Sequence, residues 1–350
     1  MNRTELSKLL VERVLNDGLN VKDYLVSQKQ LITKTDENVN VKIGIRNEDD
    51  YSFDLHPNSI TQISQKLNIP SKYLSSLAEG TKWEKELFAT TLNEHFTNLA
   101  QSKPVLLRAN ENTLKGYLSN SFERYNSTSV LKQFLESFML NGMIFHEAYY
   151  DGITYFIELR NDNNVIMLNN TPHFFGVQYR NSDFGRSALD IKLILIKQIC
   201  SNGMLMKSAL RQVHRSRAIE IGDSFLLSPE TMEKETEAKV SLIKDIANYA
   251  CSDEMISEIV NVYNKVNELD VSSENVFKTL ENLGATKKDV DYITKLLIEN
   301  KPETGVSDGN TIIKVANAVS YMANNELLEK AEVINRYKEM SGNLINYYGN

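Results

Sequence analysis

The sequence predicts an α+β fold, in which an antiparallel sheet with covering helices is followed by a helical C-terminal region. Three observations lead to this class. Apolar and polar residues alternate between 21 and 55, which is the period of half-exposed strands. Further strands follow one another between 143 and 200, around the hairpin turn Asp151-Gly152. After Pro229 the apolar residues recur only with a helical period.

The first third of the chain predicts a small sheet with helices on one face. Residues 4–17 have apolar side chains at helical spacing, and Gly18 is a stop signal. The alternating residues of 21–55 then predict strands. From 59 to about 102 the period is helical again, in three segments, and Ile69-Pro70 opens the second of them.

The middle of the chain predicts an antiparallel unit. Residues 104–118 suit a β-hairpin with its turn at 110–112, although this turn lacks the usual glycine. A helix is expected from about Ser127 to Leu140, with apolar residues on one face. The remaining expected strands are 143–149, 153–159, 165–168, 173–180 and roughly 188–200.

The end of the chain predicts helices only. They are expected at 230–269, 272–284, 286–300, 311–324 and 326–346, with a loop at 301–310. We therefore expect two parts, an α+β core domain over 1–228 and a helical C-terminal region over 229–350.

Charge separates these two parts. The whole chain of 350 residues has 39 Lys and Arg against 46 Asp and Glu, a formal charge of −7. Residues 221–350 hold 13 basic and 22 acidic residues, and 1–220 hold 26 and 24. The protein as a whole is thus not the basic body of a simple electrostatic nucleic-acid binder, but a local basic surface remains open.

The cellular setting follows from what the sequence lacks. Two cysteines, Cys200 and Cys251, and no signal peptide predict a reducing compartment without disulfides. No apolar run approaches 18 residues, so no membrane contact is expected. We expect a cytoplasmic protein, in the host cell if a phage encodes it.

The densest basic segment is 178–217, which carries eight Lys or Arg residues against two Asp, with Tyr179 and Phe184 near its start. A positive groove with aromatic platforms suits single-stranded nucleic acid, because phosphates are charged and bases stack. The alternative is that Lys192 and Lys197 lie on the wet side of a strand and that the last arginines are ordinary solvated residues.

A second basic candidate lies at 103–126, where cations accompany Tyr117, Phe122 and Tyr125. If 104–118 is a hairpin, Arg108 and Lys115 come close across it and present a cationic face. The alternative, which we favour here, is that the aromatic residues belong to the core and the cations are scattered.

Catalytic motifs are missing from the sequence. It has no HExxH, CxxC or CxxH pattern, and its five histidines never have the spacing of a helical zinc pair. It also has neither GxxxxGK[ST] nor GxGxxG, so ATP or dinucleotide chemistry has no support. Cys200 ends an apolar run and is expected to be an inert buried thiol. We predict a protein that is not an enzyme and uses no cofactor or metal.

Several runs resemble a phage- and plasmid-encoded family whose shared domain has no known function. They are LLRANENTLKGYLSNSFERYNSTSVLKQF (106–134), FFGVQYRNSDFGRSALDIKLILIKQICSNGML (174–205), ALRQVHRSR (209–217) and the helical run 310–345, with IPSKYL at 69–74. The pattern N-S-x-x-G-x-x-A-L, followed by C-x-N-G-M, is the most specific part. The chain departs from the family at 181–188, where the family is more acidic, and at Lys115, where it often has Arg.

This resemblance implies a protein similar to the single-strand annealing proteins of phage recombination. Such proteins assemble into rings or filaments, hold single-stranded DNA in a basic groove and use no nucleotide. The DNA-binding residues that it implies are Arg180, Arg186, Lys192, Lys197, Lys207, Arg211, His214, Arg215 and Arg217, with Arg108, Lys115 and Arg124 second.

Two other functions stay open. A homo-oligomeric assembly or anti-defence factor that binds protein and no nucleic acid would fit the net charge, with the helices at 311–346 as its interface. A hydrolase or nuclease with an unrecognised site has no motif in its favour.

Overall fold

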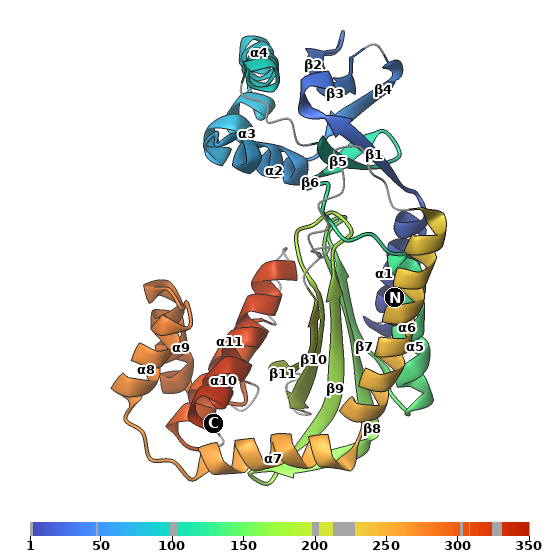
Figure 1. The fold of residues 1–350 in the computed structure, drawn as a ribbon. Helices are drawn as coiled ribbons and strands as arrows, with labels where there is room; N and C mark the ends of the chain where they lie inside the picture. The colour runs from blue at the N-terminus through green and yellow to red at the C-terminus, as the bar shows by residue number, and fades with distance from the viewer. Residues whose placement is uncertain are drawn as a thin grey trace.

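The computed structural model describes residues 3–46, 48–98, 104–197, 203–212, 228–301, 304–307, 309–323 and 331–349. Its elements form two lobes (Figure 1). The small lobe contains the described elements between residues 21 and 119, and the large lobe contains the N-terminal helix and the described elements after residue 119. Each lobe has a mainly antiparallel sheet, and the C-terminal part is helical, so the predicted α+β class is confirmed.

The small-lobe sheet has the strand order β1-β5-β6-β4-β3-β2. Its strands are β1 (Val21–Ser27), β2 (Leu31–Thr35), β3 (Val41–Ile45), β4 (Glu48–Leu55), β5 (Pro104–Asn110) and β6 (Thr113–Ser119), with a 3₁₀ turn at Gln28–Gln30. The β4–β6 pair is parallel, because three helices and β5 intervene between these strands in the chain. The expected 104–118 hairpin is confirmed. Its turn replaces the missing glycine with Glu111, whose φ is 51°.

Three helices cover one face of this sheet, as predicted: α2 (Pro57–Leu67), α3 (Ser71–Glu79) and α4 (Lys82–Asn98). His56 caps α2 by accepting a hydrogen bond from the N–H of Asn58, and Asn68 ends the helix in the left-handed region. The small-lobe core is the apolar layer between helices and sheet, to which Leu31, Ile43, Ile63, Phe88 and Phe96 contribute.

The large-lobe sheet has the order β11-β10-β9-β8-β7 and is antiparallel throughout. Its strands are β7 (Ile144–Tyr150), β8 (Tyr155–Leu168), β9 (Thr171–Asn181), β10 (Leu189–Lys197) and β11 (Gly203–Gln212). The prediction of a separate strand at 165–168 is wrong. It is the end of β8, which continues through an irregularity between Asn161 and Val165. Strand β11 was not expected.

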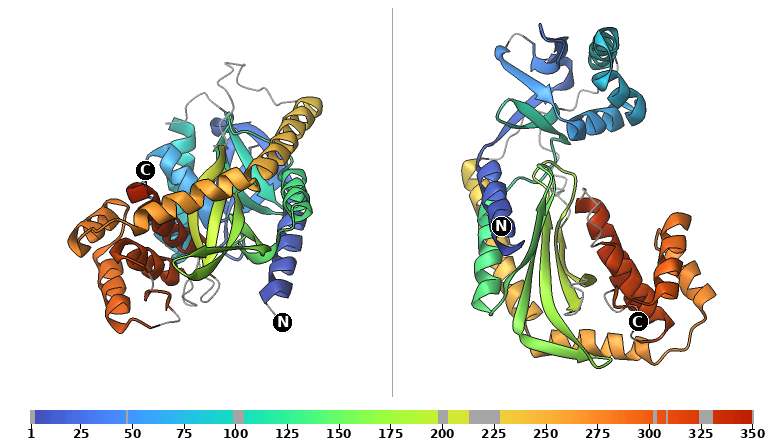
Figure 2. Two further views of the ribbon diagram at one scale, coloured as in Figure 1. Left: turned by 90° about the horizontal axis from the view of Figure 1, so that it is seen from below. Right: turned by 180° about the vertical axis from the view of Figure 1, so that it is seen from behind.

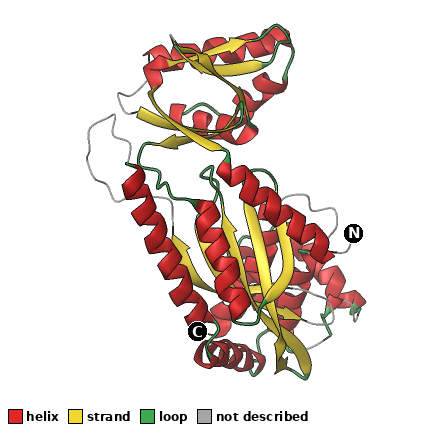
Figure 3. Ribbon diagram, turned by 90° about the vertical axis from the view of Figure 1, so that its right-hand side faces the viewer, coloured by secondary structure: helices red, strands yellow, loops and turns green. Residues whose placement is uncertain are grey.

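Helices lie on both faces of the large-lobe sheet (Figures 2 and 3). One face carries α1 (Arg3–Leu19), α5 (Ser127–Leu140) and α6 (Pro229–Ala250), and the other carries α10 (Thr311–Met322) and α11 (Ala331–Gly349). Helix α5 has the predicted bounds. Helix α1 runs past the expected stop at Gly18, where a Cβ atom would lie 2.7 Å from the Thr128 hydroxyl, so Gly18 permits close packing against α5.

The helix expected at 230–269 is two helices, α6 and α7 (Asp253–Asn267). Ser252 separates them, because its hydroxyl accepts a hydrogen bond from the N–H of Met255 and so begins a new helix. The remaining helices are α8 (Ser273–Asn282) and α9 (Lys287–Glu299), near the positions predicted.

One hydrophobic core joins the large-lobe sheet to the C-terminal helices. It includes Tyr179 and Leu193 of the sheet together with Ile313 and Val319 of α10. Helix α10 is buried almost all round, including its polar residues Asn317 and Ser320. The described helices of the interface expected at 311–346, α10 and α11, thus contribute to the core within this chain.

Candidate functional site

The loop between β9 and β10 joins the two lobes. Ser182 donates from its hydroxyl to the carbonyl of Ile153 at 2.7 Å, which holds the loop on the large lobe. The carbonyl of Phe184 accepts from the side-chain amides of Asn58 at 3.2 Å and Gln62 at 2.8 Å, both on α2 of the small lobe. The N-S-x-x-G segment of the sequence therefore lies at this joint.

Arg108 on β5 reinforces the joint. Its guanidinium donates to the carboxylate of Asp23 at 2.8 Å and to the carbonyl of Asp183 at 2.7 Å, and it lies 5.5 Å from the ring centre of Phe122. The side chain is buried. Arg108 therefore makes internal contacts and does not present a cationic face. The favoured alternative, which places the aromatic residues Tyr117, Phe122 and Tyr125 in the core, is confirmed for these three residues.

Arg124 differs from every other candidate cation whose side chain is described. It is only 5% exposed, and within the described residues its side chain has no ion pair and its Nε has no hydrogen-bond acceptor. Burial lowers the pKa of Arg124, Asp23 raises it and Arg108 lowers it further. A buried guanidinium without a partner is energetically costly.

Arg124 lines a pocket of about 900 Å³, which we call the interlobe pocket. Its polar wall contains Asp23, Arg108, Arg124, Asp183 and Ser127. Its apolar wall contains Leu19, Val21, Met232 and Val240. The N-terminal half of α6, from Pro229 to Val240, lines one side. There the Thr236 hydroxyl accepts a hydrogen bond from the backbone N–H of Asn126 at 3.0 Å. The pocket has the volume of a typical small-ligand site.

Asp183 occupies the N-terminal end of α5 within this pocket. Burial raises the pKa of the Asp183 carboxyl, whereas Arg108 and a hydrogen bond with Ser127 lower it and Asp23 raises it. The helix dipole favours a carboxylate there. Arg108 and the helix end thus have carboxylate partners within the protein, whereas Arg124 makes no ion pair among the described residues.

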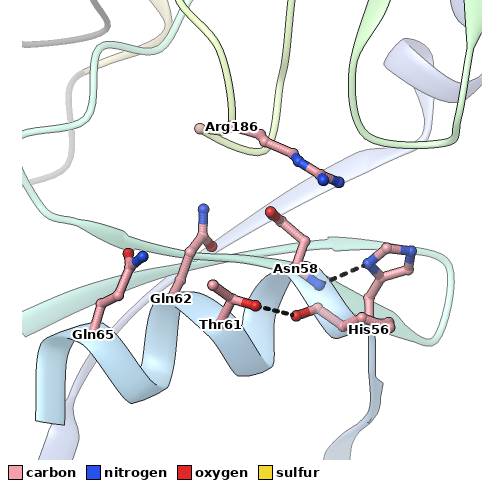
Figure 4. Close-up of a pocket in the computed structure, with 8 residues that line it drawn as sticks. His56, Asn58, Thr61, Gln62, Gln65 and Arg186 are labelled. Atoms are coloured by element: carbon pink, nitrogen blue, oxygen red, sulfur yellow. Dashed lines mark hydrogen bonds between the residues drawn. The ribbon is translucent and has the colours of Figure 1, made fainter. Parts of the chain in front are cut away.

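A second pocket, of about 300 Å³, lies between α2 and the joining loop, to which Arg186 belongs (Figure 4). Arg186 extends from the loop over the first turns of α2, where His56, Asn58 and Gln62 face it. Burial lowers the pKa of His56, as do the charges of Lys115 and Arg186, while Asp151 raises it. Arg186 is already paired with Glu332 of α11.

The basic segment 178–217 does not form an open groove over its described part. Arg180 and Lys192 both reach Glu339 of α11, at 3.5 and 2.5 Å, and Arg186 pairs with Glu332. Two glutamates of α11 therefore pair with three cations of the segment, and Arg180 and Lys192 share one of them. The cations belong to the more basic first part of the chain and the glutamates to the acidic last part, so the two parts pair in the folded protein.

The other candidates have different positions. Lys197 is buried and donates to the carbonyl of Gly305 at 3.0 Å, so the alternative that places it on the wet side of a strand is wrong. Lys115 is half-buried, donates to the carbonyl of Gly152 at 3.3 Å and lies 5.3 Å from the ring centre of Phe184. Lys207 and Arg211 belong to β11. His214, Arg215 and Arg217 lie outside the described residues.

Sequence reasoning did not identify most of the residues that line the interlobe pocket. Asp23, Asp183, Ser127 and the first turns of α6 come from distant parts of the chain. The sequence singled out two of the lining residues, Arg108 and Arg124, among the second group of candidate cations. That Arg124 makes no ion pair among the described residues is visible only once the chain is folded.

The described residues offer little support for metal binding, for a membrane-spanning helix or for thiol chemistry. Among the residues that the structure describes, no three His, Cys, Asp or Glu side chains are placed to hold a metal ion. In the same ranges no helix combines the length and apolarity needed to cross a bilayer. Burial raises the pKa of the free Cys251 thiol to about 11, which makes it a poor nucleophile. Cys200 lies outside the described residues.

Comparison with known proteins gives no match to this chain, whether among family models, curated proteins or solved structures. The resemblance to the phage family and the activity it implies therefore remain predictions.

Proposed function

We propose that this protein is a non-enzymatic single-stranded DNA-binding and annealing protein of a phage or other mobile element, acting as an oligomer in recombination or replication. In this proposal the DNA backbone enters the interlobe pocket, and Arg124 binds one phosphate. The basic segment 178–217 is a secondary contact at most, because α11 pairs its described cations on that face.

The observation that carries the proposal is the buried side chain of Arg124, which has no ion pair within the described residues and whose Nε has no hydrogen-bond acceptor there. Burial of a charge that has no ion pair destabilises the folded state. A ligand phosphate would supply the missing charge and hydrogen-bond acceptors, and Arg binds phosphates with favourable geometry. An anionic ligand is therefore the simplest explanation for this side chain.

The rest of the pocket suits one nucleotide of a strand. Leu19 is 66% exposed and lies with Val21 and Met232 on the apolar wall, where they offer a surface for a sugar or base. The aromatic residues Phe122 and Tyr125 are buried, so they support the arginines and do not stack on bases. Contact with one nucleotide by one cation gives weak binding, and a multimer would sum many such contacts.

The test compares wild type with Arg124→Gln. Binding of a labelled single-stranded oligonucleotide and of its duplex is measured by fluorescence anisotropy at low and moderate salt, with light scattering on the same samples. We expect a multimer that prefers the single strand, and about tenfold weaker binding by the variant, which corresponds to the removal of one charged hydrogen bond. The slope of log affinity against log salt should become shallower by about 0.7 for each phosphate that the variant no longer binds.

The matched control is Lys132→Gln. Lys132 is an exposed cation on α5, so this change alters the net charge equally without touching the pocket. Equal weakening by both variants would rule out the pocket as the binding site. No DNA binding by a folded multimer would favour the protein-binding assembly factor instead. If the protein prefers the single strand but does not accelerate the annealing of complementary strands, it binds DNA without annealing activity, and the annealing part of the proposal is wrong.

A further inference from the structure

We infer that the interlobe pocket selects internal phosphodiesters of a DNA strand and discriminates against terminal phosphate groups and free nucleotides. This inference rests on the proposed function and adds the class of phosphate that the site accepts. It comes from the carboxylates that share the pocket with Arg124.

The pocket has more acidic than basic side chains. Two arginines line it, together with the aspartates Asp23 and Asp183 and two glutamates of α6, Glu233 and Glu237. With all of them ionised the lining has a net charge of −2. Asp23 neutralises Arg108 at 2.8 Å, so Arg124 is the cation left to bind an anion.

The four carboxylates of the pocket differ in burial. Asp23 and Asp183 are partly buried beside the arginines, and their positions are set by Arg108 and Ser127. Glu233 and Glu237 are exposed on the first turns of α6, one helical turn apart on the same face. They form an acidic rim that an incoming phosphate must pass.

The charge of the ligand then decides the outcome. An internal phosphodiester has one negative charge, which Arg124 balances. A terminal phosphomonoester has about −1.5 to −2 at neutral pH, so its additional charge meets only carboxylates. Repulsion at short range in a partly buried site is stronger than in bulk water. The same argument applies to a free mononucleotide, whose phosphate is also a monoester.

The experiment uses the full-length protein and short single-stranded oligonucleotides labelled at the 3′ end, with either a 5′-hydroxyl or a 5′-phosphate. Binding is measured by anisotropy, and unlabelled dTMP serves as a competitor. We expect the 5′-phosphate to leave the affinity unchanged or to weaken it, and dTMP to compete poorly. Compared with wild type, the double variant Glu233→Gln/Glu237→Gln should bind the 5′-phosphorylated strand at least about threefold more tightly. Its gain in affinity for the 5′-hydroxyl strand should be smaller.

The control is Glu230→Gln/Glu235→Gln, which removes the same charge from the same helix at exposed residues that do not line the pocket. Tighter binding of the 5′-phosphorylated strand by wild type, effective competition by dTMP, or equal effects of the two double variants would each overturn the inference while the proposed function stands. Absence of any single-strand binding by folded wild type would overturn both.

Discussion

Lys338 on α11 donates from its ammonium group to both carboxylate oxygens of Glu158 on β8, at 2.8 and 2.9 Å, and to Glu147 on β7 at 2.8 Å. Lys338 and Glu158 are almost fully buried. Burial alone would lower the pKa of Lys338, but the two glutamates raise it, so the lysine stays charged. This group fixes the C-terminal helix α11 to the sheet.

Lys338→Met should therefore destabilise the protein by about 3–5 kcal/mol, because two glutamates lose their cation inside the protein. The double variant Lys338→Met/Glu158→Gln should lose less. Urea unfolding measures both effects. Lys234→Met is the control, since the Lys234–Glu230 pair is exposed and should change stability by less than about 1 kcal/mol. Equal losses at positions 338 and 234 would show that the buried group does not hold α11.

Arg124→Met should leave the free energy of unfolding unchanged or raise it by about 1 kcal/mol, because it removes a buried charge that has no partner in the described residues. The same variant should lose DNA binding. Urea unfolding and anisotropy on one preparation give both values. A large loss of stability would mean that Arg124 supports the fold, and the binding argument would then lose its basis.

Asp289 should link α9 to α11 in a pH-dependent way. Burial would raise the pKa of Asp289, but hydrogen bonds from the Thr286 N–H and the Tyr337 hydroxyl, both at 2.8 Å, and the charge of Arg336 hold it below its usual range. A pKa lowered by folding adds stability above the unfolded value of about 3.9, and this stability is lost as the pH falls through the folded value.

Asp289→Asn should thus cost about 2 kcal/mol at neutral pH, the size of charged hydrogen bonds. The difference from wild type should stay constant down to about pH 5 and shrink below about pH 4. Unfolding curves at several pH values measure it, with Asp291→Asn, an exposed change on the same helix, as control. A difference that does not depend on pH would contradict the role of the charge.

Asn93 on α4 protects the edge of the small-lobe sheet. Its side-chain amide accepts from the Thr33 N–H at 2.7 Å and donates to the Thr33 carbonyl at 2.8 Å, in place of a neighbouring strand. Asn93→Ala should cost about 1–3 kcal/mol and expose the β2 edge to intermolecular pairing. Urea unfolding and light scattering during storage test this. Asn98→Ala, which removes only an exposed bond to Glu94, should have little effect.

Local signals account for the elements that were predicted well. The bounds 127–140 of α5 follow from the Asn126 cap and an apolar face, both contained in neighbouring residues. Strand β11 was missed because Met204-Leu205-Met206-Lys207 has no alternation of polar and apolar residues. It is a strand because β10 supplies its hydrogen bonds. The break between α6 and α7 was missed because a single cap at Ser252 interrupts two helices with similar periodicity.

Local signals do not predict the candidate site. The sequence singled out eleven Lys and Arg residues and one histidine, and most of them belong to one basic segment. It could not assign Glu332 and Glu339 to that segment, since they lie about 150 residues away in the chain. Nor could it separate Arg108, which Asp23 neutralises, from Arg124, which has no partner in the described residues.

Apolar periodicity, turn residues and helix caps in the chain thus establish the α+β class and the positions of most helices and strands, because each depends on contacts within a few residues. The fate of each charge was decided by folding. Coulombic and hydrogen-bond partners are set by distance in space, and the burial that makes an unpaired guanidinium costly exists only when both lobes and α6 close around it.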